Sequence, residues 1–295
     1  MRDQYERVTK LFWRAAACLL ALCSITVARA HPPALRVHTF AFVDGSRTLR
    51  LPDGRSVARR LVTQVWWPAT RGPHPLVVFA HGFALTPADY ASLLRAIASA
   101  GYVVAAPIFP LTNADAPGGP NEADLVNQPR DVSFVITRLL ALDRSNGTLH
   151  ATIEPSRIAV AGQSDGGITA LSVAYDARYR DRRVRAAIIM SGARPSGFSS
   201  FPRTGPPLLA MQGTADPLNA PATTAAYFAS AYRPKFLVWL LGASHRPPYT
   251  TEQPQLGIVE RSAVAFLGHY LESRPLAAFE RAARRPGLTQ LVADP

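Results

Sequence analysis

The stretch Ala159-Val160-Ala161-Gly162-Gln163-Ser164-Asp165-Gly166-Gly167 places the pattern Gly-x-Ser-x-Gly between two apolar segments. Residues 158–161 have no polar alternation, which is typical of a strand buried on both faces, and residues 168–175 continue as an alanine-rich helical segment. A serine on so sharp a strand-to-helix turn has a strained backbone and an exposed hydroxyl. It needs small residues two positions before and after it, because the strand and the helix come very close there. We therefore predict that Ser164 is a nucleophile.

Apolar runs typical of strands alternate with helical segments along the rest of the chain. Strands are predicted at 35–43, 61–67, 76–80, 102–106, 158–161, 184–190, 208–212 and 236–241, and helices at about 86–100, 128–142, 168–175, 221–232 and 251–272. This alternation predicts an α/β fold, with a mostly parallel central sheet, helices on both faces and no large cap domain. Ligands of such sheets bind beyond the carboxyl ends of the strands, where Ser164 is expected to lie.

Two other side chains follow predicted strands, in the chain order Ser, Asp, His that a nucleophile turn of this kind uses. Asp216 follows the strand 208–212 in Gly213-Thr214-Ala215-Asp216-Pro217. Its alternative role is that of a turn former, which is common for Asp before Pro. His245 follows the last predicted strand, in Gly242-Ala243-Ser244-His245. We predict that His245 is the base and that Asp216 is the acid that orients it.

An anionic intermediate also needs hydrogen-bond donors, and backbone N–H groups supply them in such sites. One should come from Asp165, directly after the nucleophile. The other should come from the loop after the strand 76–80, where Gly82 allows close approach of the backbone and Phe83 N–H is the expected donor. His81 is expected to brace this loop, and we assign it no chemical role.

Together these segments resemble the α/β-hydrolase superfamily. The resemblance is carried by His81-Gly82-Phe83, by Gly162-Gln163-Ser164-Asp165-Gly166-Gly167, by Gly213-Thr214-Ala215-Asp216-Pro217 and by Gly242-Ala243-Ser244-His245. The most similar group contains the dienelactone-hydrolase-like, chlorophyllase-like and platelet-activating-factor-acetylhydrolase-like serine esterases, with bacterial cutinases and polyester hydrolases as neighbours. The segment 61–69 also resembles the acetylhydrolase-like members. The resemblance covers about residues 35–272 and implies an α/β-hydrolase fold.

The chain departs from these groups at three places. Gln163 stands where many esterases have His, and Gln212 stands where dienelactone-type enzymes often have His. The segment 188–192 lacks the tryptophan that polyester hydrolases use in an aromatic clamp. The nucleophile is a serine, so the cysteine chemistry of true dienelactone hydrolases does not carry over.

Residues 1–30 are predicted to be a secretory signal peptide. Basic residues precede an apolar run at 15–27, and the small-x-small sequence Ala28-Arg29-Ala30 follows it. An uncleaved anchor is the alternative, but the run is short for a bilayer span. Both cysteines, Cys18 and Cys23, lie in this leader, so the mature chain has no disulfide and no thiolate metal site. We expect a secreted or periplasmic protein with a catalytic domain at 31–272 and a polar, basic tail at 273–295, for which a short extra helix is the alternative.

The formal net charge of the chain is +12, and almost all of its basic residues are arginines, since Lys10 and Lys235 are the only lysines. The arginines form no long run and accompany no nucleic-acid motif, so the charge does not indicate polyanion binding as the main function. We expect no nucleic-acid partner, no membrane anchor after cleavage and no metal or organic cofactor. A monomer is favoured.

The segment 191–206 is too short to hold a cap, so an open cleft without a lid is expected. Its predicted rim consists of Phe83, the loop 107–127, Phe198, Phe201, Pro217, Leu218 and the segment after His245. These features predict a secreted serine hydrolase that cleaves carboxylic esters with short to medium acyl chains through an acyl-enzyme. The alternatives are a polyester or cutin hydrolase, an amide or peptide hydrolase with the same triad, and a non-catalytic binding protein with this fold.

Overall fold

The computed structural model describes residues 34–295, and the predicted signal peptide lies outside them. The strands are β1 (Leu35–Arg50), β2 (Ser56–Pro68), β3 (His74–Ala80), β4 (Val103–Ile108), β5 (Ile153–Gln163), β6 (Val184–Met190), β7 (Leu208–Gly213), β8 (Lys235–Leu240) and β9 (Thr289–Asp294). The α-helices are α2 (Ala91–Ser99), α3 (Gln128–Arg144), α4 (Asp165–Tyr175), α5 (Pro221–Ser230), α6 (Pro247–Thr250), α7 (Gln255–Glu272) and α8 (Leu276–Ala283). Two 3₁₀ helices, η1 (Pro87–Tyr90) and η2 (Glu122–Asn127), precede α2 and α3.

All nine strands of the described chain form one sheet, in the order β1-β2-β4-β3-β5-β6-β7-β8-β9. The six central strands, from β4 to β8, pair in parallel, whereas β1, β2 and β9 are antiparallel to their neighbours at the two edges. The central strands are buried almost throughout, because helices cover both faces of the sheet. The predicted α/β fold with a mostly parallel sheet is therefore confirmed.

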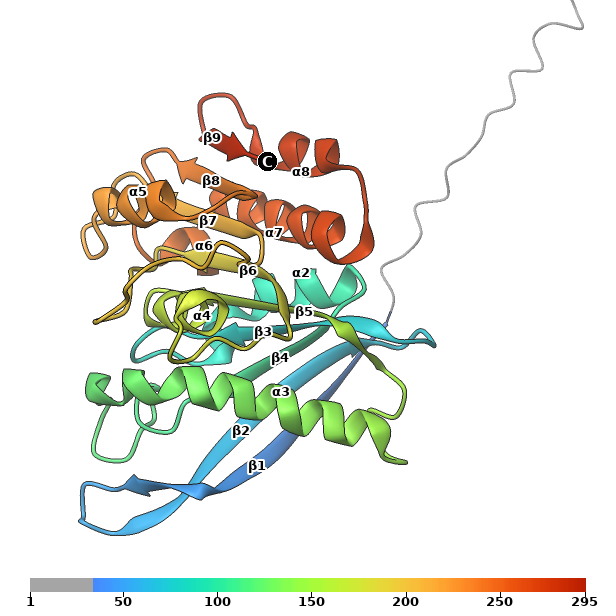
Figure 1. The fold of residues 1–295 in the computed structure, drawn as a ribbon, viewed down its shortest axis with the longest axis vertical. Helices are drawn as coiled ribbons and strands as arrows, with labels where there is room; N and C mark the ends of the chain where they lie inside the picture. Colours follow the sequence, from blue (N-terminus) through green and yellow to red (C-terminus); the bar gives the residue numbers. More distant parts are fainter. Residues whose placement is uncertain (1–33) are drawn as a thin grey trace, which may run out of the picture. The chain divides into compact units, whose positions relative to one another are not determined.

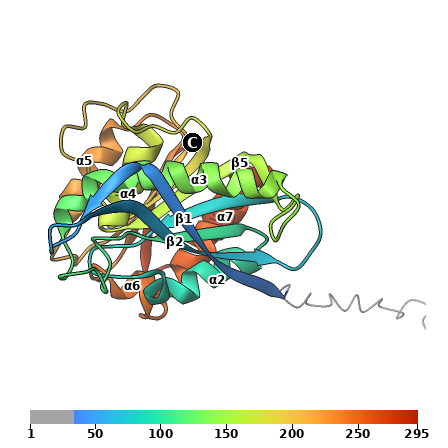
Figure 2. The ribbon, with the colours of Figure 1, turned by 90° about the horizontal axis from the view of Figure 1, so that it is seen from below.

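Helices α3, α4 and α5 cover one face of the sheet, and α2, α7 and α8 cover the other (Figures 1 and 2). Successive side chains of a strand point to opposite faces, so Val77 and Val78 belong to different halves of the core, as do Ile188 and Ile189. The apolar runs of the sequence supply both halves at once. This double burial explains why these strands carry no polar alternation.

The C-terminal segment 273–295 contains the short extra helix that we considered, but it also contains a strand that we did not predict. It contains α8 and the strand β9, which pairs antiparallel with β8 from Leu240↔Thr289 to Lys235↔Asp294. Phe279 of α8 is fully buried, and its ring lies 5.1 Å from that of Phe236. The segment thus completes one edge of the sheet. The prediction missed β9 because an edge strand is half exposed, and the mixed composition of residues 289–294 resembles that of a loop.

No helix in residues 34–295 is both long enough and apolar enough to cross a membrane. The same residues contain no group of three or more His, Cys, Asp or Glu side chains that could hold a metal ion.

Candidate active site

Ser164 lies on the turn between β5 and α4, at the carboxyl end of β5. Figure 1 shows β5 near the middle of the sheet and α4 packed on it. Its backbone has φ 56° and ψ −122°, a left-handed conformation that is strained for a residue with a side chain. The neighbouring glycines allow this turn. A Cβ atom on Gly162 would lie 2.0 Å from the carbonyl oxygen of Gly166, and one on Gly166 would lie 1.9 Å from that of Ala80. The sequence pattern requires small residues at these positions because backbone segments are in direct contact there.

The structure brings the three predicted side chains into one hydrogen-bonded chain. His245 follows β8, and its Nε2 lies 2.9 Å from Ser164 Oγ. Its Nδ1 lies 2.8 Å from Asp216 Oδ2, in the turn after β7. A carboxylate can only accept, so Nδ1 carries the proton and Nε2 faces the serine hydroxyl with its lone pair. This is the tautomer in which a histidine can take a proton from Ser164.

The carboxylate of Asp216 is held in its ionised, accepting form. Its Oδ1 accepts hydrogen bonds from the backbone N–H groups of Leu218 and Asn219, both at 2.9 Å, and its Oδ2 accepts one from Gln212 Nε2 at 2.9 Å. Burial alone would raise the pKa of Asp216, but the hydrogen bonds from His245, Asn219 and Gln212 lower it below its usual value. Asp216 also forms the local turn, so the two roles considered for it coincide.

The two predicted oxyanion donors are the backbone N–H groups of Asp165 and Phe83. Asp165 is the first residue of α4, and Phe83 lies on the loop after β3. No group in residues 34–295 accepts a hydrogen bond from either N–H. The donor on Asp165 is also at the positive end of the helix dipole, which favours a negative charge there. Asp165 directly follows Ser164, and Phe83 lines the same cleft as Ser164, so both predicted donors lie near the nucleophile with their hydrogens unused by the described chain.

His81 fixes the orientation of the Gly82–Phe83 peptide. Its Nδ1 donates to the carbonyl oxygen of Gly82 at 2.8 Å, and its Nε2 accepts from the backbone N–H of Phe109 at 3.1 Å. The carbonyl of Gly82 and the N–H of Phe83 belong to one planar peptide and point in opposite directions. A bond to the carbonyl therefore also sets the direction of the predicted oxyanion donor. Burial lowers the pKa of His81 to about 4, so the ring is neutral at pH 7.

The Asp165 carboxyl group is an unusual neighbour for a nucleophile. The residue is 6 % exposed, and no group of the described chain donates to its Oδ2. Burial and, secondarily, the charge of Glu122 raise the pKa of Asp165 to about 6. The sequence placed this carboxyl group next to the nucleophile but did not predict its raised pKa.

A cleft of about 490 Å³ opens above Ser164 and His245. Its walls include the predicted rim residues Phe83, Pro217 and Leu218, together with Leu85, Arg246 and Pro247. The loop 107–127 instead lines an adjacent hollow of about 750 Å³ that shares Phe83 with the cleft. Phe198 and Phe201 were wrongly predicted to line the rim. Phe201 is buried against Tyr175, the last residue of α4, and Phe198 packs against Phe201. Both rings therefore belong to the core and not to the rim of the cleft.

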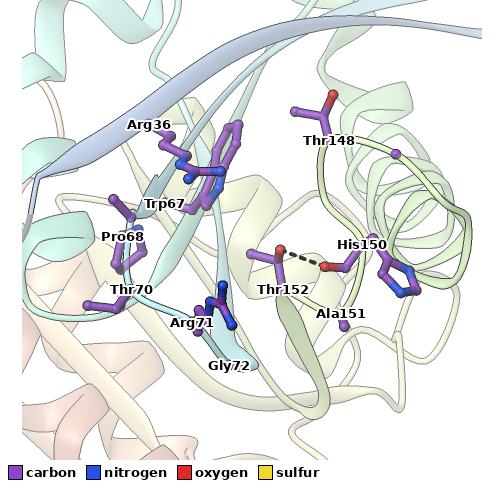
Figure 3. Close-up of a pocket in the computed structure, with 12 residues that line it drawn as sticks. Arg36, Trp67, Pro68, Thr70, Arg71, Gly72, Thr148, His150, Ala151 and Thr152 are labelled. Carbon is purple, nitrogen blue, oxygen red and sulfur yellow. Dashed lines mark hydrogen bonds between the residues drawn. The ribbon is translucent and has the colours of Figure 1, made fainter.

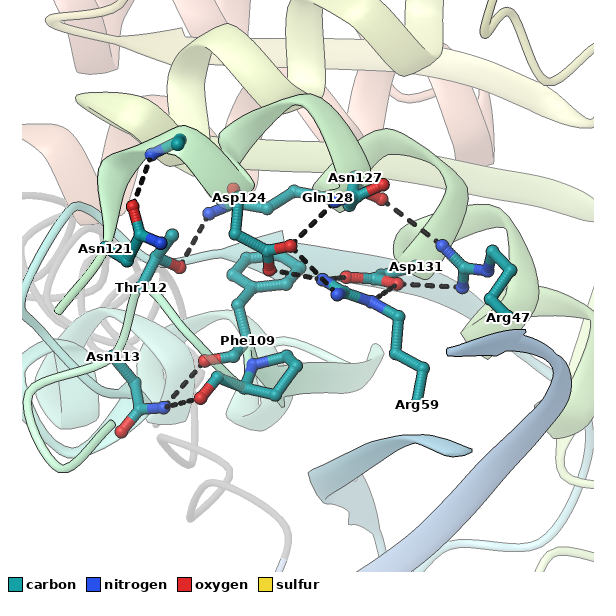
Figure 4. Close-up of polar contacts among 12 residues, drawn as sticks. Arg47, Arg59, Phe109, Thr112, Asn113, Asn121, Asp124, Asn127, Gln128 and Asp131 are labelled. Atoms are coloured by element: carbon teal, nitrogen blue, oxygen red, sulfur yellow. Dashed lines mark hydrogen bonds and ion pairs between the residues drawn. The ribbon is translucent and has the colours of Figure 1, made fainter. Parts of the chain in front are cut away.

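A buried ion cluster anchors the segment that runs from Phe109 to α3 (Figure 4). Arg59 of β2 makes paired hydrogen bonds of 2.6–3.0 Å to Asp124 and to Asp131, and all three side chains are almost completely buried. Burial alone would lower the pKa of Arg59, but the two carboxylates raise it, so the guanidinium remains charged. Phe109, where this segment begins, donates its N–H to the ring of His81.

Another hollow, of about 410 Å³, lies at the other end of the parallel strands from Ser164, next to the beginnings of β3 and β5. Figure 3 shows the residues that line it. Arg36, Trp67, Arg71 and His150 are among the residues that line it. It contains none of the predicted site residues.

Two residues that the sequence marked only as departures contact the site directly. Gln212 is fully buried; it binds Asp216 and accepts a hydrogen bond from Thr224 at 2.7 Å. Gln163 is fully buried between Tyr90 and His245. Tyr90 was not predicted to be part of the site, because a tyrosine at the start of a helix has no sequence signal that separates it from a core residue.

The parallel sheet, the strained serine turn and the Ser-His-Asp geometry define the protein class as an α/β-hydrolase. A family model described as chlorophyllase matches residues 52–225, a segment that includes Phe83, Ser164 and Asp216 and ends before His245. The chain belongs to the chlorophyllase family, an esterase-type family of α/β-hydrolases. This confirms the chlorophyllase-like esterase group among those that the sequence resembles.

The chain is also similar to individual proteins. Chlorophyllase-1 of Arabidopsis thaliana is 28% identical over 170 residues, which cover 57% of this chain and 50% of that protein. The chain thus spans about half the length of this curated relative. The structure of a ferulic acid esterase from Streptomyces cinnamoneus superposes with a TM-score of 0.65 at 21% identity, covering 88% of this chain and 96% of the esterase. At this identity the likeness establishes the fold alone.

Proposed function

We propose that this protein is a secreted serine hydrolase that cleaves carboxylic esters of short to medium acyl chains. The observation that carries the proposal is the hydrogen-bonded chain from Ser164 through His245 to Asp216, beside two unused backbone N–H groups. Membership of an esterase-type family supports the same reaction class. Secretion is inferred from the N-terminal leader alone.

The proposed reaction has two halves. His245 Nε2 takes the hydroxyl proton as Ser164 Oγ attacks the ester carbonyl, and the N–H groups of Phe83 and Asp165 hold the resulting oxyanion. The tetrahedral intermediate collapses, the alcohol leaves with the proton from His245, and an acyl-enzyme remains. His245 then takes a proton from water, the hydroxide attacks the acyl carbonyl, and the acid is released with Ser164 Oγ reprotonated. Asp216 stabilises the imidazolium that forms in both halves.

The walls of the cleft support the substrate class. Phe83 is 37% exposed and Leu218 is 72% exposed, so two large apolar side chains face solvent next to the nucleophile. An exposed apolar pair of this kind favours a ligand with an apolar group on at least one side of the ester. Arg246 adds one cation to the same walls. The relative's name, Chlorophyllase-1, and the neighbour's name, ferulic acid esterase, make chlorophyll and ferulate esters two specific substrates to test.

Turnover of p-nitrophenyl esters from acetate to dodecanoate tests the proposal, with residues 31–295 and its Ser164→Ala variant assayed in parallel. We expect activity that is highest for short to medium chains and absent in the variant. Methyl ferulate and chlorophyll a, assayed under the same conditions, distinguish a small phenolic ester from a bulky pigment ester as the natural substrate class.

The other outcomes select among the alternatives. Turnover of a matched anilide at a rate close to that of the ester would indicate an amide hydrolase, because the same groups serve both reactions. Release of soluble acids from a polyester film would indicate a polymer substrate. A folded protein that turns over nothing, and whose Ser164 does not react with a phosphonate, would be a binding protein.

A further inference from the structure

One pair of buried polar side chains connects three of the four segments of the proposed site, namely the Gly82 loop, the Ser164 turn and the His245 loop. Tyr90 lies at the end of η1 and Gln163 at the end of β5, and both are fully buried. Tyr90 Oη accepts a hydrogen bond from the backbone N–H of Gly82 at 3.2 Å and lies 2.7 Å from Gln163 Oε1. Gln163 Nε2 lies 3.0 Å from the carbonyl oxygen of His245. Gly82, Gln163 and His245 follow or end three different strands.

The chemistry of the end groups fixes the direction of every bond in this chain. The carbonyl of His245 can only accept, so the Gln163 amide nitrogen must face it and the amide oxygen must face Tyr90. The Tyr90 hydroxyl therefore donates to Gln163, and its lone pair accepts from Gly82 N–H. Each of these four groups has a hydrogen-bond partner in this arrangement and in no other. Buried groups that are fully paired hold one geometry, because each alternative leaves a buried group unpaired.

We infer that Tyr90 and Gln163 are positioning residues, which hold the oxyanion loop and the His245 loop in register with the Ser164 turn. The Gly82 N–H that Tyr90 holds and the Phe83 N–H are on adjacent peptide units, so a shift of Gly82 moves the oxyanion donor. The spacing is tight, since a Cβ on Gly82 would lie 3.0 Å from Gln163 Oε1 and 3.1 Å from Tyr90 Oη. The expected effect on kcat rests on the proposed function, whereas the expected loss of order in the loop 81–85 does not.

Two variants remove the connection at different points. Tyr90→Phe removes the hydroxyl and leaves Gly82 N–H and Gln163 Oε1 without partners. Gln163→Leu keeps a similar volume and removes the bonds to Tyr90 and to the His245 carbonyl. Tyr102→Phe is the matched control, because Tyr102 is equally buried and its hydroxyl binds Glu272 at 2.6 Å, outside the site.

The first readout does not depend on activity. Hydrogen exchange of peptides that cover residues 81–85 reports on the bond from Gly82 N–H to Tyr90. We expect exchange there to be about tenfold faster in Tyr90→Phe and unchanged in Tyr102→Phe, with both variants folded by circular dichroism. Unchanged exchange at residues 81–85 in Tyr90→Phe would overturn the inference, whether or not the protein is an esterase.

The second readout is the kinetics of p-nitrophenyl butyrate hydrolysis, corrected for active protein by exhaustive phosphonate titration. An oxyanion donor binds charge that develops only in the transition state, so its displacement should lower kcat about tenfold and leave KM nearly unchanged. Because the two side chains form one connection, the combined variant should lose less than the product of the single losses. A rise in KM at constant kcat, or the same loss in Tyr102→Phe, would contradict the positioning role. No activity in the parent protein would refute the proposed function instead, and the exchange result would still decide the inference.

Discussion

His81 gives the structure a sensitivity to acid that can be calculated and measured. The ring is fully buried, with Nδ1 donating to Gly82 and Nε2 accepting from Phe109 N–H. A protonated ring would present a second N–H to the N–H of Phe109 and would carry an unpaired buried charge. Burial accordingly lowers the pKa of His81 to about 4. Acidification should therefore lower the free energy of unfolding through this residue.

The direction in which stability changes with pH follows from the direction of the pKa shift of His81. The pKa of an unfolded histidine is about 6.5. Because the folded value is lower, the unfolded chain binds more protons between these two values, and stability falls as the pH falls through this window. The full difference corresponds to about 3 kcal/mol, and the loss between pH 7 and pH 4.5 to about 2 kcal/mol.

Urea unfolding at several pH values between 7 and 4.5 measures this contribution. The His81→Asn variant cannot titrate there, so its free energy of unfolding should depend on pH less steeply than that of the parent, by nearly one proton. The exposed His38 supplies the control, and His38→Asn should keep the parent's slope. Equal slopes for the parent and for His81→Asn would refute the assignment of a neutral, buried His81.

Three further changes test other parts of the account. Asp216→Asn should lower kcat by about 10³–10⁴ at pH 7 without changing the fold, because an amide no longer selects the tautomer with a bare Nε2; near-normal kinetics would move the acid role elsewhere. Gly166→Ala should prevent accumulation of folded protein, since its Cβ would lie 1.9 Å from a backbone oxygen, whereas Gly45→Ala, with nothing within 4 Å, should be tolerated; the soluble yield and Tm of the two variants decide this. Arg59→Met removes the paired hydrogen bonds of two buried carboxylates and leaves Asp131 with Arg47 and Asp124 with Asn127, so it should cost about 3 kcal/mol of unfolding free energy in urea; a loss below 1 kcal/mol would mean that the cluster is not structural.

The sequence was sufficient for the parts of the fold that local pattern determines. Short apolar runs such as 186–190 predicted strands covered on both faces, and the sheet contains a strand there. The glycines around Ser164 predicted the strained turn, because backbone contacts at this point exclude any side chain. The spacing of Asp216 and His245 from the ends of their strands was enough to bring both to Ser164, since parallel strands end at one edge of the sheet.

The remaining features depend on contacts between distant segments. Arg59 and Asp131 are 72 positions apart, and Tyr90 and Gln163 are 73 apart. Nothing local distinguishes these residues from surface arginines or from core tyrosines. The same reason explains the error at Phe198 and Phe201, which follow β6 as rim residues would but turn inward to cover α4. The edge strand β9 was missed because half of its residues face solvent.

Labelling with a fluorophosphonate tests the central claim most directly. A phosphonate reacts only with a serine whose hydroxyl is activated by a base, and the displaced fluoride leaves one covalent adduct. Intact-mass spectrometry of residues 31–295, followed by peptide mapping, should show a single adduct on Ser164, which is absent in Ser164→Ala and greatly slowed in His245→Ala. A folded parent protein that forms no adduct, or an adduct that maps to another serine, would contradict the account.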